Sequence, residues 1–316
     1  MSSRAEPVSS YRHLKATDRA GLMVLITYGL VTTAGVALSM GSGLQWFLGQ
    51  VVLAVALVQW FVTMHEAGHG TLFATAKYNT WAGHIASFFS LIPFHSWRII
   101  HHEHHRWTGW QDLDPTTEAL VPRELATFEK VVVNTCWWLW IPLFSVLYRV
   151  NNFWRVDRLV KRVPERHYPR VKRNLKALGF VYGVLLLAGG PMFWLKLMGL
   201  AMLMSFMFMD LILFSQHNHI PQKLSGGESV QPHVFLEQEV YTRSLSFPAW
   251  FAKGVLLNFN AHELHHMYPS VPGYCLGEID YQTQNEIGWW AWIWQSKRVP
   301  AATLMFKNRH DTGLTL

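Results

Sequence analysis

Histidine is concentrated in four short windows of the sequence. Seventeen of the 316 residues are histidine, more than twice the number expected from a usage of roughly 2%. The imidazole ring of histidine binds Fe, Zn, Cu and Ni. The sequence therefore predicts a nitrogen-ligated metal site. The windows contain His65 and His69; His101, His102, His104 and His105; His217 and His219; and His262, His265 and His266.

The spacing within three of these windows places histidines on one face of a helix, because residues three and four apart are neighbours there. His102 lies off the face of its own window. Eight nitrogen ligands exceed the four positions of a tetrahedral zinc. The three windows therefore predict two metal ions. The eight residues are His65, His69, His101, His104, His105, His262, His265 and His266.

Cysteine is scarce, and its scarcity excludes several kinds of metal site. Cys136 and Cys275 are the two cysteines in the sequence. Two cysteines exclude a disulfide scaffold, a cysteine-ligated zinc ribbon and an iron–sulfur cluster. We expect the scattered histidines to be ordinary core or surface side chains. These are His13, His84, His167, His233 and His310.

Residues 65–69 and 262–266 also match the H-E-x-x-H pattern of zinc metalloproteases. A membrane zinc protease would leave His101, His104 and His105 without a role. The number and identity of the metals separate the two interpretations, since a protease would bind one zinc.

Four apolar stretches are each long enough, or nearly so, to cross a bilayer, which takes about 20 residues. Short turns at residues 41–43 and 189–191 join them in pairs. The chain is 50% hydrophobic and 15% charged, which excludes a disordered chain, a coiled coil and a nucleic-acid-binding tail. We therefore expect one all-α membrane domain over residues 1–316, with four transmembrane helices in two hairpins. The predicted spans are about 21–40, 44–64, 175–188 and 196–214.

Lysine and arginine fall almost entirely on one side of these spans. The turn residue Lys196 is the one exception among 27. By the positive-inside rule, both termini and the histidine windows are expected on the cytoplasmic side, in a helical cap. Aromatic-rich stretches such as 131–148 are typical of interfacial or re-entrant helices. The basic run 149–176 is expected against anionic headgroups, and no nucleic-acid partner is expected.

The three histidine windows 65–69, 101–105 and 262–266 resemble the three histidine boxes of integral-membrane fatty acid desaturases. The flanking residues 93–98 and 112–115 resemble the acyl-lipid branch of that family, which includes Δ12 and ω-3 enzymes. Ser215–His219 resembles the segment that ends the fourth span in the family, and Asn260 resembles the residue that precedes the third box.

The resemblance implies a four-span helical fold with a cytoplasmic di-iron centre. The eight boxed histidines are the implied ligands, with His217 as the ninth and His219 as the alternative. Asn260 and Asp210 are expected beside the ligands, and no catalytic side chain is implied beyond the ligands themselves. Asp210 also draws attention because a carboxylate within a span is costly.

The implied reaction uses dioxygen as co-substrate and removes two hydrogens from an acyl chain of a lipid. Its electrons would come from an external donor such as a ferredoxin or a small haem protein. The alternative is a lipid or carotenoid hydroxylase or ketolase with the same di-iron site. A non-catalytic metal transporter is less favoured, because the first two spans offer few polar side chains. The short loops and the lack of an endoplasmic-reticulum retention tail favour a bacterial inner membrane.

Overall fold

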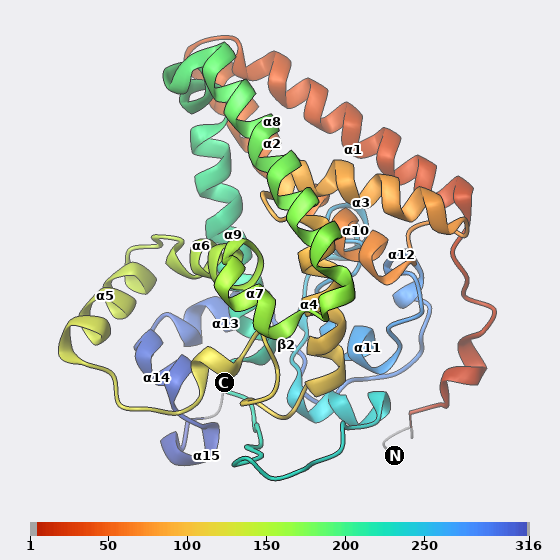
Figure 1. Cartoon of the computed structure of the whole chain (residues 1–316), viewed down its shortest axis with the longest axis vertical. Coiled ribbons are helices and arrows are strands. Elements are labelled where there is room, and N and C mark those ends of the chain that lie inside the picture. Colours follow the sequence, from red (N-terminus) through yellow and green to blue (C-terminus); the bar gives the residue numbers. More distant parts are fainter. Residues whose placement is uncertain (1–4, 315–316) are drawn as a thin grey trace. The chain divides into compact units, whose positions relative to one another are not determined.

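The computed structural model describes residues 5–314, and most of them are helical (Figure 1). The helices are α1 (Asp18–Ser39), α2 (Gly43–His69), α3 (Ala76–Ser90), α4 (Phe94–Trp107), α5 (Thr127–Trp138), α6 (Leu143–Arg149), α7 (Val156–Arg162), α8 (Tyr168–Trp194), α9 (Leu200–His217), α10 (Ala249–Gly254), α11 (His262–Met267), α12 (Gly273–Leu276), α13 (Trp289–Ser296), α14 (Ala301–Phe306) and α15 (Arg309–Thr312). Two short strands, β1 (Leu245–Ser246) and β2 (Ile287–Gly288), pair in parallel.

The chain divides into two compact units, each built from separate stretches of sequence. The first unit contains the residues up to Leu14, Ile100–Tyr148 and the residues from Met209 onward. The second unit contains Lys15–Ile99 and Arg149–Phe208.

In the second unit, α1 and α2 form a hairpin whose helices approach closely at glycines. A Cβ added to Gly35 would lie 2.8 Å from the Leu53 side chain, and one added to Gly49 would lie 2.4 Å from the backbone nitrogen of Ser39. Small residues at such crossings are typical of packed membrane helices. The predicted first hairpin is therefore present, with its turn before Gly43.

Gly190 interrupts the long apolar run that follows. It has φ 72° inside α8 and is followed by Pro191, so the chain reverses there and returns through the π-helical turn Leu195–Gly199 into α9 (Figure 1). The buried amide of Gln50 on α2 fixes this return. Its nitrogen donates to Leu197 O at 2.7 Å, and its oxygen accepts from Ala201 N at 3.0 Å.

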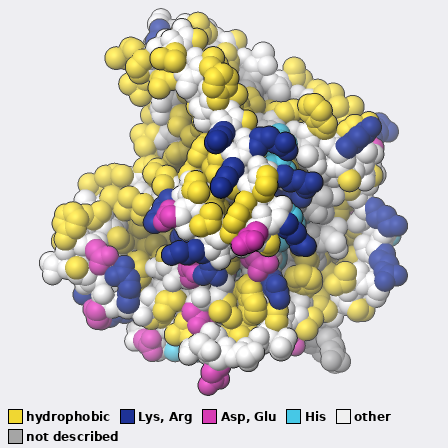
Figure 2. Space-filling view, in the orientation of Figure 1, with side chains coloured by type: hydrophobic (Ala, Val, Ile, Leu, Met, Phe, Trp, Pro, Cys, Tyr) yellow, Lys and Arg dark blue, Asp and Glu magenta, His cyan; other side chains and the backbone are white. Residues whose placement is uncertain are grey.

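Within residues 5–314, three helical runs are long and apolar enough to cross a membrane, namely Asp18–Ser39, Gly43–His69 and the 53-residue Glu165–His217, which contains the Gly190 break. A fourth candidate is the pair Thr127–Trp138 and Leu143–Trp154, bent by 112°. Hydrophobic side chains cover the end of α8 nearest the break in Figure 2. The protein is a mostly helical membrane protein with three or four candidate spans.

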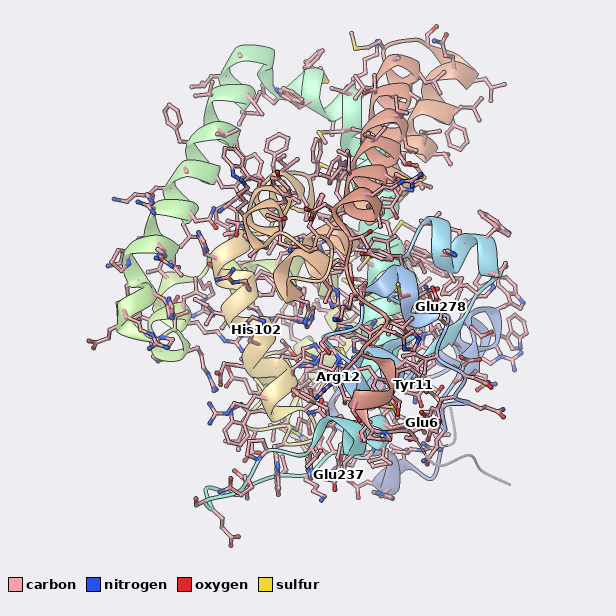
Figure 3. All side chains as sticks on the ribbon, turned by 90° about the vertical axis from the view of Figure 1, so that its right-hand side faces the viewer. Glu6, Tyr11, Arg12, His102, Glu237 and Glu278 are labelled. Atoms are coloured by element: carbon pink, nitrogen blue, oxygen red, sulfur yellow. The ribbon has the colours of Figure 1, made fainter. Side chains whose placement is uncertain are left out.

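In the first unit, the N-terminal segment packs against the chain that follows α11. The ring of Tyr11 meets that of Tyr268 edge-on at 5.0 Å, and the Tyr268 hydroxyl donates to Glu6 O at 2.7 Å. Figure 3 labels Tyr11 and Glu6 on this segment. The contact anchors the C-terminal end of α11, the helix that carries the third histidine window.

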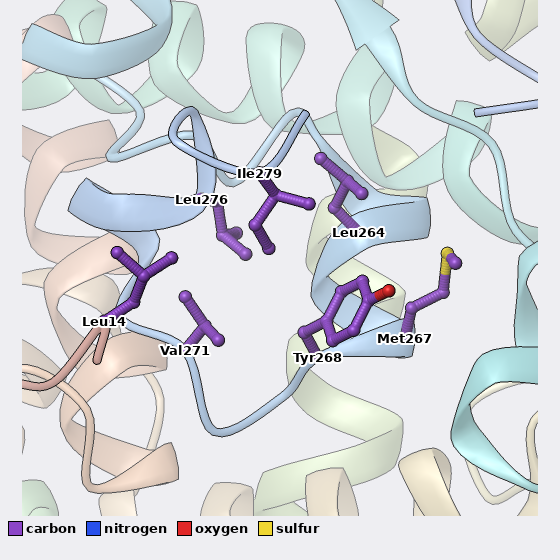
Figure 4. Close-up of a cluster of buried hydrophobic side chains, with 7 residues drawn as sticks. All are labelled: Leu14, Leu264, Met267, Tyr268, Val271, Leu276 and Ile279. Carbon is purple, nitrogen blue, oxygen red and sulfur yellow. The ribbon is translucent and has the colours of Figure 1, made fainter. Parts of the chain in front are cut away.

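A cluster of buried apolar side chains holds α11 against α12 (Figure 4). Burial of such side chains contributes about 1.5–3 kcal/mol each, so the six-residue α11 is held by packing rather than by its own length. The cluster contains Leu14, Leu264, Met267, Tyr268, Val271, Leu276 and Ile279.

The C-terminal end of α9 is fixed by the buried guanidinium of Arg243. It donates to the carbonyls of Ser215, Asn218 and His219 at 2.9–3.2 Å and lies 4.6 Å from the Trp292 ring centroid. The last carbonyls of a helix lack partners within the helix, and Arg243 satisfies several of them. This cap sets the orientation of His217 on the last turn of α9.

Candidate metal centre

Four histidines from three helices meet within the first unit. His104 comes from α4, His217 from α9, and His262 and His266 from α11; one nitrogen of each lies within 4.8 Å of those of the other three. The Nε2 atom of His262 lies 2.8 Å from that of His217 and 3.1 Å from that of His266. We call these four residues the tetrad.

Three of the four tetrad histidines have an oxygen atom beside the ring nitrogen that points outward. His104 Nδ1 lies 2.7 Å from Asp114 Oδ2, His266 Nδ1 lies 2.9 Å from Gln238 Oε1, and His217 Nδ1 lies 3.3 Å from the carbonyl of Tyr241. An oxygen partner on the outer nitrogen fixes the tautomer that leaves the inner lone pair available, as in metal-bound histidines. The rings are thus oriented for a cation at their centre.

A second set of three histidines lies on α4 and α11, two of the three helices that carry the tetrad. His105 Nε2 lies 3.1 Å from His101 Nε2 on α4 and 3.0 Å from His265 Nε2 on α11. The amide of Gln238 links this trio to the tetrad, because its nitrogen donates to His105 O at 2.8 Å while its oxygen contacts His266.

His65 and His69 belong to the second unit and lie on the last turn of α2, with ring centroids 4.8 Å apart. Between them, Gly68 is packed against Trp97, since a Cβ at residue 68 would lie 2.1 Å from that ring. Gly70, in the left-handed conformation with φ 78°, ends the helix directly after His69. The pair is therefore held at a rigid helix end.

Burial favours the neutral form of His266, the form that binds metals. Burial first, and then the neighbouring histidines, lower the pKa of His266 well below its usual range. Burial alone would raise the pKa of Asp114, but His104 and the backbone N–H of Thr116 hold this pKa below its usual value. A neutral imidazole is the state of histidine that metal binding requires.

The residues fit a nitrogen-ligated metal such as iron. Facing Nε2 atoms 2.8–3.1 Å apart cannot all carry hydrogens, so lone pairs face one another unless a proton or a cation lies between them. Imidazole suits iron, zinc and copper alike. The donor set therefore supports a metal centre.

Both glutamates of the two H-E-x-x-H patterns are held by contacts within the protein, and Glu66 Oε1 lies 3.2 Å from His65 Nδ1. Glu263 accepts hydrogen bonds from the backbone nitrogens of Ser244 and Asn285 at 3.1 and 2.7 Å. Glu66 accepts from the Thr71 hydroxyl at 2.8 Å. The buried Glu263 joins α11 to the segments beside β1 and β2, which is unlike the water-facing general base of a protease.

Asn260 and Asp210, which the resemblance places beside the ligands, form hydrogen bonds with the backbone. Asn260 donates to Leu245 O at 2.8 Å, and its own carbonyl accepts from Leu245 N at 3.0 Å, so it joins the start of α11 to β1. Asp210 accepts a hydrogen bond from Ser145 N in the first turn of α6. Their predicted position beside the ligands remains a prediction.

The structure distinguishes His217 from His219. His217 lies in the tetrad, whereas His219 Nε2 lies 2.7 Å from the Thr312 hydroxyl of α15. His102 on α4 is exposed and is labelled in Figure 3. Sequence reasoning missed Asp114 and Gln238 as ring partners, since neither lies at helical spacing from its histidine.

Comparison with known proteins agrees with this site. The fatty acid desaturase family model matches residues 11–294. An endoplasmic-reticulum omega-3 fatty acid desaturase of Vigna radiata var. radiata is 25% identical over 293 residues, which cover 87% of this chain and 74% of that protein. A chloroplastic sn-2 acyl-lipid omega-3 desaturase (ferredoxin) of Helianthus annuus is 24% identical over 277 residues, 84% of this chain and 60% of its own length.

An endoplasmic-reticulum acyl-lipid omega-3 desaturase (cytochrome b5) of Arabidopsis thaliana is 23% identical over 288 residues, covering 84% of this chain and 71% of its own length. The family model spans nearly the whole chain and includes all the histidine windows. The protein therefore belongs to the fatty acid desaturase family and is an oxidoreductase that desaturates fatty acyl chains.

Proposed function

We propose that this protein desaturates acyl chains esterified in membrane lipids, using two iron ions and dioxygen. The tetrad is the observation that carries the proposal, because three buried imidazoles and the half-buried His217 converge, and three of the four have an oxygen partner on the outer nitrogen. The names of the relatives from Helianthus annuus and Arabidopsis thaliana support an acyl-lipid substrate.

The tetrad is assigned one iron, and the trio His101, His105 and His265 is assigned the other, with His65 and His69 kept as ligands that the resemblance implies. Bound iron supplies the activation of dioxygen that an unactivated CH₂ group demands and that no side chain provides. Asp114 and Gln238 keep the outer nitrogens occupied, and the buried surroundings exclude water from the centre.

The reaction needs electrons from outside the chain. Removing two hydrogens from adjacent carbons while reducing dioxygen to two waters consumes two electrons and two protons. The two free cysteines cannot hold an iron–sulfur cluster. A ferredoxin or a cytochrome b5-type haem protein is the proposed donor, in line with the names of the relatives.

For the topology, we propose four spans in two hairpins, all part of one domain, with the histidines and both termini on the cytoplasmic side. The reversal at Gly190 divides the 53-residue run into α8 and α9, each long enough for a span. The one-sided distribution of lysine and arginine supports the orientation.

Expression in a host without desaturases tests the proposal, with mass spectrometry of intact lipids and of their released acyl chains. Wild-type protein is expected to produce chains with one further double bond, still esterified in phospholipid. His262→Ala should abolish the product, and His102→Ala should retain it. Hydroxylated chains would instead support the hydroxylase, and new double bonds in free or thioester-linked chains alone would contradict the acyl-lipid substrate.

A further inference from the structure

Two histidines outside the boxes form a close pair in the second unit. The rings of His84 on α3 and His95 at the start of α4 have centroids 4.9 Å apart. The Asn174 side chain of α8 accepts a hydrogen bond from His95 N at 3.0 Å. The three helices are thus joined around the pair, although the sequence predicts an ordinary side chain at His84.

Three arginines surround this pair. Arg98 follows His95 by one turn of α4, and Arg170 and Arg173 lie on the face of α8 that also carries Asn174. None of the three forms an ion pair within residues 5–314. Figure 2 shows lysine and arginine side chains gathered over α8 with histidine beside them. We call these five residues the basic cluster.

The pKa values of both histidines reflect this setting. Burial and Arg98 lower the pKa of His84. Burial is the first cause of a pKa of about 4 at His95, and nearby cationic side chains are the others, namely His84, Arg98, Arg170 and Arg173. Like charges held together raise the energy of the folded state, and an anion among them would offset that cost.

The surface beside the basic cluster is apolar. Trp81, three residues before His84 on α3, is 71% exposed; Phe180 and Leu187, further along α8, are 73% and 88% exposed. Tryptophan is enriched where a membrane protein meets the headgroup level, and exposed apolar residues continue into the hydrocarbon. A cationic site next to such surface fits an amphiphile rather than a soluble anion.

We propose that the basic cluster binds the phosphate of an anionic phospholipid, with the acyl chains against the exposed apolar residues of α3 and α8. Arginine suits this role because its planar fork donates two hydrogen bonds to one phosphate. The site lies outside the histidine boxes, and the inference does not depend on the proposed reaction.

The test measures lipid binding to the full-length protein by native mass spectrometry, with phosphatidylglycerol and phosphatidylcholine as probes. A basic residue near an anionic surface contributes about 1 kcal/mol, so Arg170→Ala/Arg173→Ala should weaken phosphatidylglycerol binding on the order of tenfold. Phosphatidylcholine binding should change little. The matched control is Lys172→Ala/Lys176→Ala, which removes the same charge from the same two turns of α8 but leaves both arginines in place.

Equal losses in the two double variants would overturn the proposal, since they would indicate unspecific attraction of charge to the membrane. Displacement of phosphatidylglycerol by millimolar glycerol phosphate would also overturn it, by indicating a soluble ligand. Arg170→Lys/Arg173→Lys should recover part of the binding, and unchanged iron content in every variant verifies the fold. Lipid binding and desaturation are measured separately, so failure of one leaves the other intact.

Discussion

Two histidine pairs in this protein have almost the same geometry and very different surroundings. The rings of His217 and His262 have centroids 4.8 Å apart and cross at 77°, and those of His84 and His95 are 4.9 Å apart and also cross at 77°. Each pair joins two helices within one unit of the structure. Closeness of the rings therefore does not separate a metal site from another kind of site.

The atoms around the rings make the difference. In the tetrad, oxygen atoms of Asp114, Gln238 and Tyr241 occupy outer nitrogens, and the region favours a cation. Around His84 and His95, the neighbouring charges are those of arginines, and the region favours an anion. Oxygen partners, more than histidine density, distinguish the proposed metal ligands from the other histidine pair.

The largest effect is expected from His266→Ala, which removes a proposed direct ligand. An outer partner of a ligand is typically worth a 10–100-fold effect, so loss of the ligand should exceed about 100-fold in iron affinity and abolish desaturation. Iron content by mass spectrometry and product yield measure the two effects. His84→Ala, from the other pair, should keep its iron; equal loss from both variants would contradict the contrast.

Asp114→Asn comes next, because it replaces the ionised acceptor of His104 with a neutral amide. We expect iron affinity to fall about 10–100-fold, measured by competition with a chelator of known affinity. Asp112→Asn is the matched control. Asp112 lies two residues before Asp114 but accepts hydrogen bonds from the backbone nitrogen and hydroxyl of Ser225 instead of contacting a histidine. An unchanged affinity in Asp114→Asn would show that the carboxylate does not orient the ring.

Local patterns in the sequence predicted much of this arrangement. The 3.6-residue period placed His101, His104 and His105 on one face, and the structure places all three in buried positions of α4, with His102 exposed. The sequence also predicts the break at Gly190. Glycine readily adopts a positive φ and proline lacks a backbone N–H, so both residue types indicate a helix break directly in the sequence. Apolar length indicated α1 and α2 within a few residues of their bounds.

Contacts between distant segments could not be predicted in this way. Gln238 lies 28 residues from His266 on a 3-10 turn, and only the folded chain brings its amide to the ring. The basic cluster likewise joins α3, α4 and α8. No pattern in the sequence around His84 predicts that the arginines of α8 lie near it. The pair Thr127–Trp138 and Leu143–Trp154 has the composition of a span, and its 112° bend is visible only in the folded chain.

Gln238→Ala should have a smaller effect than Asp114→Asn, because the amide is a neutral partner of His266. A neutral hydrogen bond contributes about 1 kcal/mol, which corresponds to a fall in iron affinity of roughly fivefold. The same chelator competition measures it. Gln284→Ala provides the control, as Gln284 binds Glu239 rather than a histidine; a similar fall there would assign the effect to general loosening of the fold.

The smallest effect concerns the basic cluster and its response to pH. Because the pKa of His95 is lowered from 6.5 to about 4 by burial and by His84, Arg98, Arg170 and Arg173, the unfolded chain binds more protons than the folded chain between those values. Stability should therefore rise with pH across this window. Between pH 7 and pH 4, the melting temperature of wild-type protein should fall a few degrees more than that of His95→Gln.

The lipid environment sharpens this last comparison. An anionic headgroup among the arginines would favour the protonated ring and raise the pKa of His95 toward its usual value. The extra fall in melting temperature should then be smaller in nanodiscs that contain phosphatidylglycerol than in phosphatidylcholine alone. The same fall in melting temperature in both lipids would show that no anionic headgroup reaches the ring of His95. The two histidine pairs would then differ only in their neighbouring protein groups, which are oxygen atoms in one pair and cations in the other.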